Sequence, residues 1–260
     1  MNKENIFPHY RKEEQGFVEK MISVVEQVSQ TQQPYLTDFV DLRQLHIIKN
    51  IVNSTMDLTM FYDGGYEGAE RARMLIAPDY WYFQKEEMDL VFFSIKGENK
   101  FHKLNHRDYL GALLNIGLKR EKFGDLLLSD EGKQVIVAKE IADYVQFQLK
   151  QVGRTKVELS QIKRDELVIP SEKIEELNIT VTSQRIDTIT ANVFNQSRSK
   201  VADFIKGKNV KVNWQVIDQV DFVLEQGDIV SLRGFGRYKF LEQEGNTKKG
   251  RIRIKIGKLV

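Results

Sequence analysis

The residues with the clearest chemistry form a basic cluster at the expected start of a helix. Ser197 is suited to cap that helix, and Arg198 and Lys200 fall in its first turn, on either side of Ser199. The start of a helix presents unpaired N–H groups and the positive end of the helix dipole, so it attracts anions. Two cations at that position predict a site for phosphate groups, such as those of an RNA backbone.

The distribution of charge supports a polyanionic partner. The whole chain of 260 residues has a formal net charge of only +2, but residues 180–260 contain 15 Lys/Arg and 8 Asp/Glu. Residues 245–260 contain six basic side chains and no acidic one. A basic end on a near-neutral chain indicates binding to a polyanion, and a solubilising tail is the alternative interpretation.

The elements around Ser197 follow an ordered pattern. A helix with Val201, Phe204 and Ile205 on its buried face is predicted to end at Gly207, and an alternating strand over 210–217 and a strand over 227–232 follow. From about 182 to 240 this order resembles the S-four-type RNA-binding domain, named after the fourth small-subunit ribosomal protein. The motifs that carry the resemblance are Arg185-Ile-Asp187, Ser197 to Lys200, Val210 to Asn213 and Gly227 to Val230.

The resemblance implies that two helices and a hairpin bind structured RNA. The chain departs from the pattern at Trp214, where many members have glycine; the indole either packs or stacks on a base. The candidate RNA contacts in this part are Arg185, Ser197, Arg198, Ser199, Lys200, Lys208, Lys211 and Asn213.

Two further basic segments extend the candidate interface. Lys119, Arg120 and Lys122 precede Gly124 and Asp125 in a tight connection, and they either contact RNA or point to solvent beside acidic neighbours. Residues 233–240, RGFGRYKF, alternate Arg233, Arg237 and Lys239 with aromatic residues. Aromatic rings can stack on bases while cations hold phosphates, although alternation in a strand assigns half of these side chains to the core.

An enzymatic alternative rests on residues 185–190. Arg-Ile-Asp-Thr-Ile-Thr resembles part of the pseudouridine-synthase motif, in which the aspartate attacks the base. Ala191 and Asn192 follow where that family has Ser-Gly, and no large catalytic domain surrounds the motif. In the S-four interpretation Asp187 is structural, pairing with Arg185 or capping a helix. An RNA-modifying enzyme or its subunit remains the second hypothesis, and a protein-interaction adaptor with an acidic first part is the third.

Other site chemistries receive little support. The chain has no cysteine, so thiolate metal sites and cysteine nucleophiles are excluded. His102 and His106 are four residues apart but lack a third ligand and an acid, so His9, His46, His102 and His106 are expected on the surface or at helix starts. We expect no catalytic residue, metal, cofactor, small-molecule substrate or membrane segment, and a cytoplasmic monomer.

The rest of the chain predicts an α+β protein of three parts. Amphipathic helices are expected over 10–30 and 38–52, then a structural glycine turn at 64–68 and a β-β-α-β-β-α-β order over 71–165. The charged stretch 163–178 is expected to be a linker. The predicted parts are an N-terminal helical domain (1–70), a middle split-βαβ-like domain (71–165) and the S-four-type domain (180–260).

Three further segments, 62–78, 111–128 and 233–240, resemble the YlmH-like family of bacterial S-four proteins. That resemblance covers most of the chain and implies an RNA-binding role for the middle domain. It also implies ribosomal RNA or tRNA as the partner, on the large ribosomal subunit carrying peptidyl-tRNA, in translation quality control.

Overall fold

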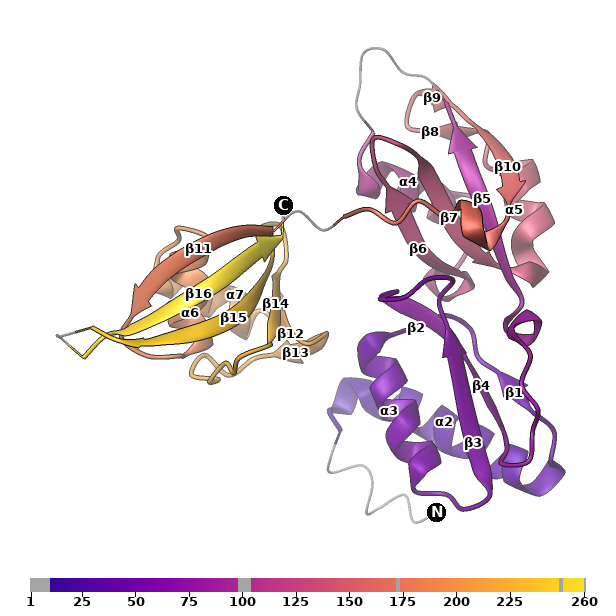
Figure 1. Ribbon diagram of the computed structural model, residues 1–260, viewed down its shortest axis with the longest axis horizontal. Helices are drawn as coiled ribbons and strands as arrows, with labels where there is room; N and C mark the ends of the chain where they lie inside the picture. The colour runs from indigo at the N-terminus through magenta and orange to yellow at the C-terminus, as the bar shows by residue number, and fades with distance from the viewer. Residues whose placement is uncertain (1–9, 98–103, 172–173, 248–249, 260) are drawn as a thin grey trace. The chain divides into compact units, whose positions relative to one another are not determined.

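The computed structural model describes residues 10–97, 104–171, 174–247 and 250–259. These fall into two compact units, 1–170 and 171–260, which are described one at a time (Figure 1). The first unit contains the N-terminal region and the middle domain, and the second is the C-terminal domain. Both units combine helices with sheets, which confirms the predicted α+β class.

Two amphipathic helices form one layer of the N-terminal region. Helix α2 (Lys12–Thr31) buries the apolar side predicted for 10–30. Helix α3 (Leu42–Asn53) begins after Asp41, whose carboxylate accepts the N–H of Gln44 at 2.8 Å. Arg43 of α3 donates to both carboxylate oxygens of Glu14 on α2, at 2.8 and 3.1 Å. This forked pair fixes one helix against the other, because a guanidinium matches a carboxylate in only a few orientations.

The prediction of a purely helical N-terminal region is wrong. Strand β4 (Arg71–Pro78) pairs with β1 (Tyr35–Leu36), β2 (Val40–Asp41) and β3 (Leu58–Asp63), and α2 and α3 pack on the resulting sheet. Strands of two residues are too short to show alternation, so β1 and β2 left no detectable pattern. The sequence grouped β4 with the middle domain, but its pairing places it here.

Without β4, the middle domain keeps the rest of the predicted order of strands and helices, and it adds a small hairpin that was not predicted. Its sheet runs β10-β5-β7-β6, with every neighbouring pair antiparallel. Helices α4 and α5 pack on one face, so the arrangement is that of a split βαβ fold. The small hairpin β8–β9 follows α5. The bounds are β5 Leu90–Lys96, α4 His106–Asn115, β6 Phe123–Leu128, β7 Lys133–Ala138, α5 Ala142–Gln148, β8 Gln151–Val152, β9 Thr155–Lys156 and β10 Glu158–Ile162. The short helical turns are η2 Lys85–Met88, η3 Arg120–Lys122, η4 Lys139–Ile141 and η5 Arg164–Glu166.

The other face of the middle sheet is covered by the N-terminal region. Phe39 is buried against Phe92 and Ile136 of that face, and its backbone N–H donates to the carbonyl oxygen of Glu121 at 2.8 Å. Gly65 has a φ of +100°, and a Cβ there would come within 2.8 Å of the Phe92 ring. The glycine turn is therefore a packing element, as predicted, because only glycine allows its backbone to lie this close to the sheet.

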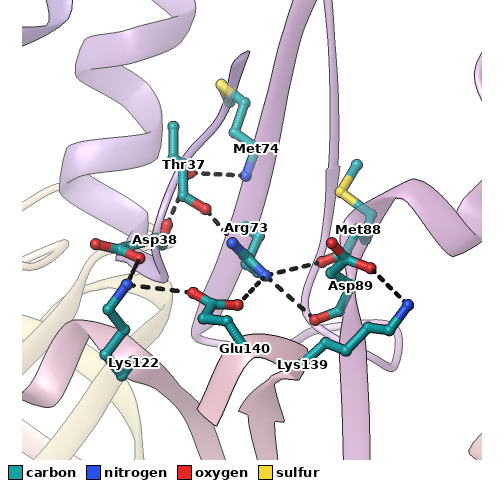
Figure 2. Close-up of polar contacts among 9 residues, drawn as sticks. All are labelled: Thr37, Asp38, Arg73, Met74, Met88, Asp89, Lys122, Lys139 and Glu140. Carbon is teal, nitrogen blue, oxygen red and sulfur yellow. Dashed lines mark hydrogen bonds and ion pairs between the residues drawn. The ribbon is translucent and has the colours of Figure 1, made fainter. Parts of the chain in front are cut away.

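A buried arginine joins the two parts of this unit (Figure 2). Arg73 of β4 donates through Nε to the Thr37 carbonyl oxygen at 2.9 Å. Its Nη1 reaches the Asp89 carbonyl oxygen at 3.2 Å and Glu140 Oε2 at 3.3 Å. Lys122 continues the network, with its ammonium 2.7 Å from Asp38 and 3.2 Å from Glu140. Charged hydrogen bonds thus connect β4, the segment before β5 and the turn after β7.

The C-terminal unit packs two helices against one face of a six-stranded antiparallel sheet of order β11-β16-β15-β14-β12-β13. In Figure 1 the helices lie behind this sheet. The predicted linker over 163–178 is too long. Leu167 packs on the middle sheet, and β11 already begins at Ile174 and pairs with β16 along its length. The bounds are β11 Ile174–Val181, α6 Ile186–Val193, α7 Arg198–Lys206, β12 Val210–Val212, β13 Gln215–Ile217, β14 Ile229–Leu232, β15 Gly236–Asn246 and β16 Ile252–Leu259.

The close approach of Phe39 to Gly124 is testable. A Cβ on Gly124 would stand 2.7 Å from Phe39 Cε1, so Gly124→Ala must displace the ring from the middle sheet. We expect a loss of about 1–3 kcal/mol in the free energy of unfolding, measured by urea denaturation. Gly132→Ala is the matched control, because a Cβ at that position meets no atom closer than 3.9 Å. Equal losses in both variants would contradict the proposed packing.

Candidate nucleic-acid interface

The predicted helix start is present at α7. Ser197 is the N-cap, and its Oγ accepts the backbone N–H of Lys200 at 3.2 Å. The Oγ atoms of Ser197 and Ser199 are 3.1 Å apart. Val201 and Ile205 bury the opposite side of the helix, so the basic first turn faces outward, with Arg198 and Lys200 exposed. Backbone N–H groups and mobile cations therefore converge at one point, which suits a phosphate.

The buried carboxylate of Asp187 pairs with two arginines of this surface. Its side chain is 5% exposed, and its Oδ2 accepts from Arg198 Nη2 at 2.6 Å. Arg185 Nε and Thr188 Oγ1 donate to Oδ1 at 3.1 and 3.2 Å. Burial alone would raise the pKa of Asp187, but the bonds from Arg198 and Arg185 hold it below the usual value. The predicted pairing with Arg185 is confirmed, and Arg198 adds a second partner that the sequence did not indicate.

Lys200 is placed by an aromatic cluster. Its Nζ lies 5.8 Å from the ring centroid of Phe235, which contacts Phe204 and Phe194 in turn. Of the aromatics in 233–240, Tyr238 and Phe240 are fully buried, which confirms that half of that segment belongs to the core. The Tyr238 hydroxyl lies 2.8 Å from Thr190 Oγ1. Burial raises the pKa of Tyr238 above the usual range.

The turn after α7 differs from the expected glycine cap. Gly207 has a φ of −76°, whereas Lys208 takes the left-handed conformation at +57°. The N–H of Asn209 bonds to the Phe204 carbonyl oxygen and that of Lys208 to Ile205, both at 2.9 Å. This is a Schellman motif with lysine in the position that usually holds glycine. A Cβ at position 207 would stand 2.9 Å from Asn209 Nδ2, a side-chain atom that can move, and 3.1 Å from the Asp203 carbonyl oxygen, so space there is tight.

The predicted strand over 210–217 is a hairpin. Strands β12 and β13 pair around Asn213 and Trp214, both with positive φ, at 48° and 66°. Asn213 keeps this turn in place, because its Nδ2 donates to Asp228 and its Oδ1 accepts the N–H of Ile229. Two consecutive left-handed residues make the tight turn of a two-residue hairpin, so the chain turns here without the glycine usual in this family.

The remaining C-terminal candidates lie apart from the α7 cluster. Lys211 and Arg237 flank Ser231 on adjacent strands, on the sheet face opposite the buried Val212 and Tyr238. Arg233 lies in the turn after β14, where its N–H donates to the Asn209 carbonyl oxygen. The structure thus gathers Arg185, Ser197, Arg198, Ser199 and Lys200 into one surface and places Lys211 and Arg237 on the other face of the sheet.

The basic segment of the middle domain is largely engaged within the chain. Arg120 Nη1 donates to the carbonyl oxygens of Phe123 and Gly124 at 2.6 and 3.1 Å. Burial, reinforced by the nearby Arg71, lowers the pKa of Arg120 to about 10. Lys122 belongs to the Arg73 network (Figure 2), and the hydrogen bond that Lys122 donates to Asp38 raises the pKa of Lys122. Of the three cations, Lys119 is the one left on the exposed surface.

Alternative chemistries find little geometric support. The Asp187 carboxylate is buried and surrounded by donors, rather than open to a substrate base. His46 is exposed and lies 3.2 Å from Asn50 Nδ2, and His106 begins α4, while His9 and His102 fall outside the described residues. Among the described residues, no three His, Asp or Glu side chains are grouped to hold a metal ion. No helix in the same part of the chain is long and apolar enough to cross a membrane.

Comparison with known proteins decides the family. Three family models match in succession: "YlmH, N-terminal" over 13–81, "Putative RNA-binding domain in YlmH" over 83–166 and "S4 domain" over 184–230. The S4 domain is the S-four-type domain expected from the motifs. A curated protein of Bacillus subtilis (strain 168) is 37% identical over 250 residues, which are 96% of this chain and 97% of that protein. The chain belongs to the YlmH family.

The relatives of this YlmH-family chain carry two different names. The Bacillus subtilis protein is named ribosome-associated protein quality control protein P2. A solved structure, cell division protein ylmH from Streptococcus pneumoniae, is 28% identical and has a TM-score of 0.54. The match covers 61% of this chain and 96% of the Streptococcus pneumoniae chain. The predicted resemblance to the YlmH family is therefore confirmed over nearly the whole length.

The role of Asp187 gives a prediction on pH. Because the folded-state pKa is lowered, the stabilisation from Asp187 is fully present above pH 4 and is lost as the pH falls through the folded value. Asp187→Asn should lower the free energy of unfolding by about 1–2 kcal/mol at pH 7, less than for a fully buried pair, since both arginines are partly exposed. Urea denaturation at pH 7 and pH 3 should show this difference shrinking in acid. A difference as large at pH 3 as at pH 7 would contradict the ion-pair role.

Lys208 allows a second test, in which stability should rise. Lys208→Gly removes a side chain from the left-handed conformation and should raise the free energy of unfolding by up to about 1 kcal/mol. Lys206→Gly, with the same loss of charge inside the last helical turn, should lower it by about 1 kcal/mol. Urea denaturation of both variants measures the pair. A loss of similar size in both would rule out the Schellman geometry.

Proposed function

We propose that this chain is an RNA-binding protein of ribosome-associated quality control, acting on structured ribosomal RNA or tRNA. The observation that carries the proposal is the α7 surface of the S4 domain. Its helix start is capped by Ser197, Arg198 is held by the buried Asp187, and Lys200 is held over Phe235. Such donors are positioned before RNA arrives, so binding loses less conformational entropy than it would with free lysines.

The partner we propose is the large ribosomal subunit carrying peptidyl-tRNA. Support comes from the Bacillus subtilis relative, whose name contains ribosome-associated quality control and which matches 96% of this chain. A role on the ribosome would place the protein in the cytoplasm. In this proposal the S4 domain supplies the main phosphate contacts, the middle domain adds further ones, and the protein acts as a monomer.

We propose that this role is binding rather than catalysis. A nucleophilic carboxylate must reach the substrate base, but both oxygens of Asp187 are engaged by arginine and threonine donors. The same contacts serve a binding surface well, because they orient Arg185 and Arg198. Removing Arg198 would also leave Asp187 with one fewer partner, so exposed lysines are the better probes of RNA binding.

Two single substitutions test RNA binding at α7 and at the opposite face of the sheet separately. Lys200→Gln and Lys211→Gln each remove one exposed cation, on α7 and on the far sheet face respectively. A lysine that contacts phosphate should lower affinity for ribosomal RNA and reduce the slope of log K against log salt by about 0.7–0.9. Lys12→Gln and Lys20→Gln on α2 are matched controls. Affinity and slope equal to wild type in both test variants would refute the proposal.

Association with the ribosome is measured separately. In a sucrose gradient of cell lysate at low salt, the wild-type chain should migrate with a ribosomal subunit, and at high salt it should dissociate. The Lys200→Gln, Lys211→Gln double variant should remain nearer the top at an intermediate salt concentration, whereas the α2 control should migrate as wild type. Wild-type protein that stays at the top of the low-salt gradient would contradict the ribosomal target.

A further inference from the structure

The sheet of the middle domain is not open to RNA. Four-stranded split-βαβ modules commonly use aromatic residues on the open sheet face to stack bases. Phe92 occupies such a position, but it is buried beneath Phe39 and Gly65, and the guanidinium of Arg164 lies 5.4 Å from its ring. The chain itself therefore covers the surface that a base would need.

The basic segment before β6 is also engaged in contacts within the chain. Arg120 bonds to backbone carbonyl oxygens, and Lys122 bridges Asp38 and Glu140. These bonds would have to break before either cation could hold a phosphate. An RNA contact in this domain is better sought among cations and rings that already face solvent.

Helix α5 presents such rings. Phe147 is 73% exposed and Tyr144, three residues earlier on the same face of the helix, is 46% exposed. The Tyr144 hydroxyl donates to the Ile116 carbonyl oxygen at 2.7 Å, so its ring has a fixed position. Lys150 Nζ lies 5.9 Å from the Phe147 ring centroid. The opposite side of α5 is buried through Val145, so these aromatics are not needed for the core.

The hairpin that follows α5 adds positive charge. Strands β8 and β9 pair Gln151 with Lys156, while Val152 and Thr155 are buried and anchor the hairpin. Arg154 lies at the turn, and both Arg154 and Lys156 are exposed. Residues 144–157 contain three cations and no carboxylate, and the exposed carboxylates of Asp143 and Glu158 flank this segment. Exposed rings next to exposed cations are the combination that binds single-stranded nucleic acid.

We propose that Tyr144, Phe147, Lys150, Arg154 and Lys156 form a second RNA site, which binds a single-stranded segment. Phe147 stacks on an unpaired base, and the three cations contact the adjacent phosphates. The inference rests on the proposed RNA-binding function and specifies how the middle domain contributes to it. The occupant is single-stranded because bases in a duplex are stacked on one another and cannot reach the ring.

The stacking contact predicts a loss confined to single strands. With full-length protein, Phe147→Ala should weaken binding of a twelve-nucleotide oligouridine about 5- to 10-fold and leave binding of a blunt RNA duplex unchanged. Phe147→Trp should retain the affinity. Tyr82→Ala is the matched control, because Tyr82 is 85% exposed in the same unit but outside the site. Circular dichroism checks that all variants are folded.

The cations are tested through the salt dependence. The triple variant Lys150→Gln, Arg154→Gln, Lys156→Gln should reduce the salt slope for the oligouridine by about 2, given roughly 0.7 per phosphate contact on single strands. Lys12→Gln, Lys20→Gln, Lys85→Gln removes the same charge from exposed positions elsewhere in the unit and should leave the slope unchanged.

Three results would contradict the proposed site. If Phe147→Ala and the triple variant bind oligouridine as wild type does, while Lys200→Gln or Lys211→Gln weakens RNA binding, the second site is wrong and the S4 domain alone binds RNA. If none of these variants weakens binding, the proposed function fails together with the second site. A loss in Phe147→Ala of equal size for duplex and single strand would exclude stacking.

Discussion

The first unit depends on the burial of Arg73. A guanidinium removed from water needs hydrogen bonds for its donors and a negative charge nearby, and these come from Thr37, Asp89 and Glu140. Because the acceptors belong to separate segments, satisfying one side chain brings together the segment after β1, the segment before β5 and the turn after β7. Phe39 and Gly65 then cover the middle sheet, and Lys122 is drawn into the same network. Burial alone would raise the pKa of Glu140, but a hydrogen bond from its own backbone N–H, together with Arg73 and Lys122, holds it below the usual value.

The C-terminal unit buries a charge of the opposite sign, the carboxylate of Asp187. Asp187 requires donors, and it finds them in Arg185 and Arg198, which are partly exposed. The contacts that satisfy the acid therefore also orient the cations at the α7 surface. In both units a buried charge engages charged neighbours. Lys122 is engaged in the Arg73 network, whereas Lys200 stays exposed beside the Asp187 network.

Sequence patterns were sufficient to locate the local features of the α7 surface. The α7 start, its cap and the Arg185–Asp187 pair are local features, separated by few residues, so the spacing was enough to find them. The basic segment over 119–122 is different, because its acidic partner Asp38 is 84 residues away from Lys122. The exposed ring of Phe147 was missed, since an aromatic in an amphipathic helix is normally assigned to the core.

The sequence by itself determined the α+β class, most of the order of elements in the middle domain, the helix start at Ser197 and the membership of the YlmH family. These follow from periodicity, capping residues and ordered motifs, all of which act over short distances along the chain. Only the tertiary structure decided that β4 belongs to the N-terminal sheet, that the middle sheet is covered and that Arg120 and Lys122 are engaged. Each of these depends on partners distant in the chain, and burial and pairing between such partners leave no periodic signal to detect.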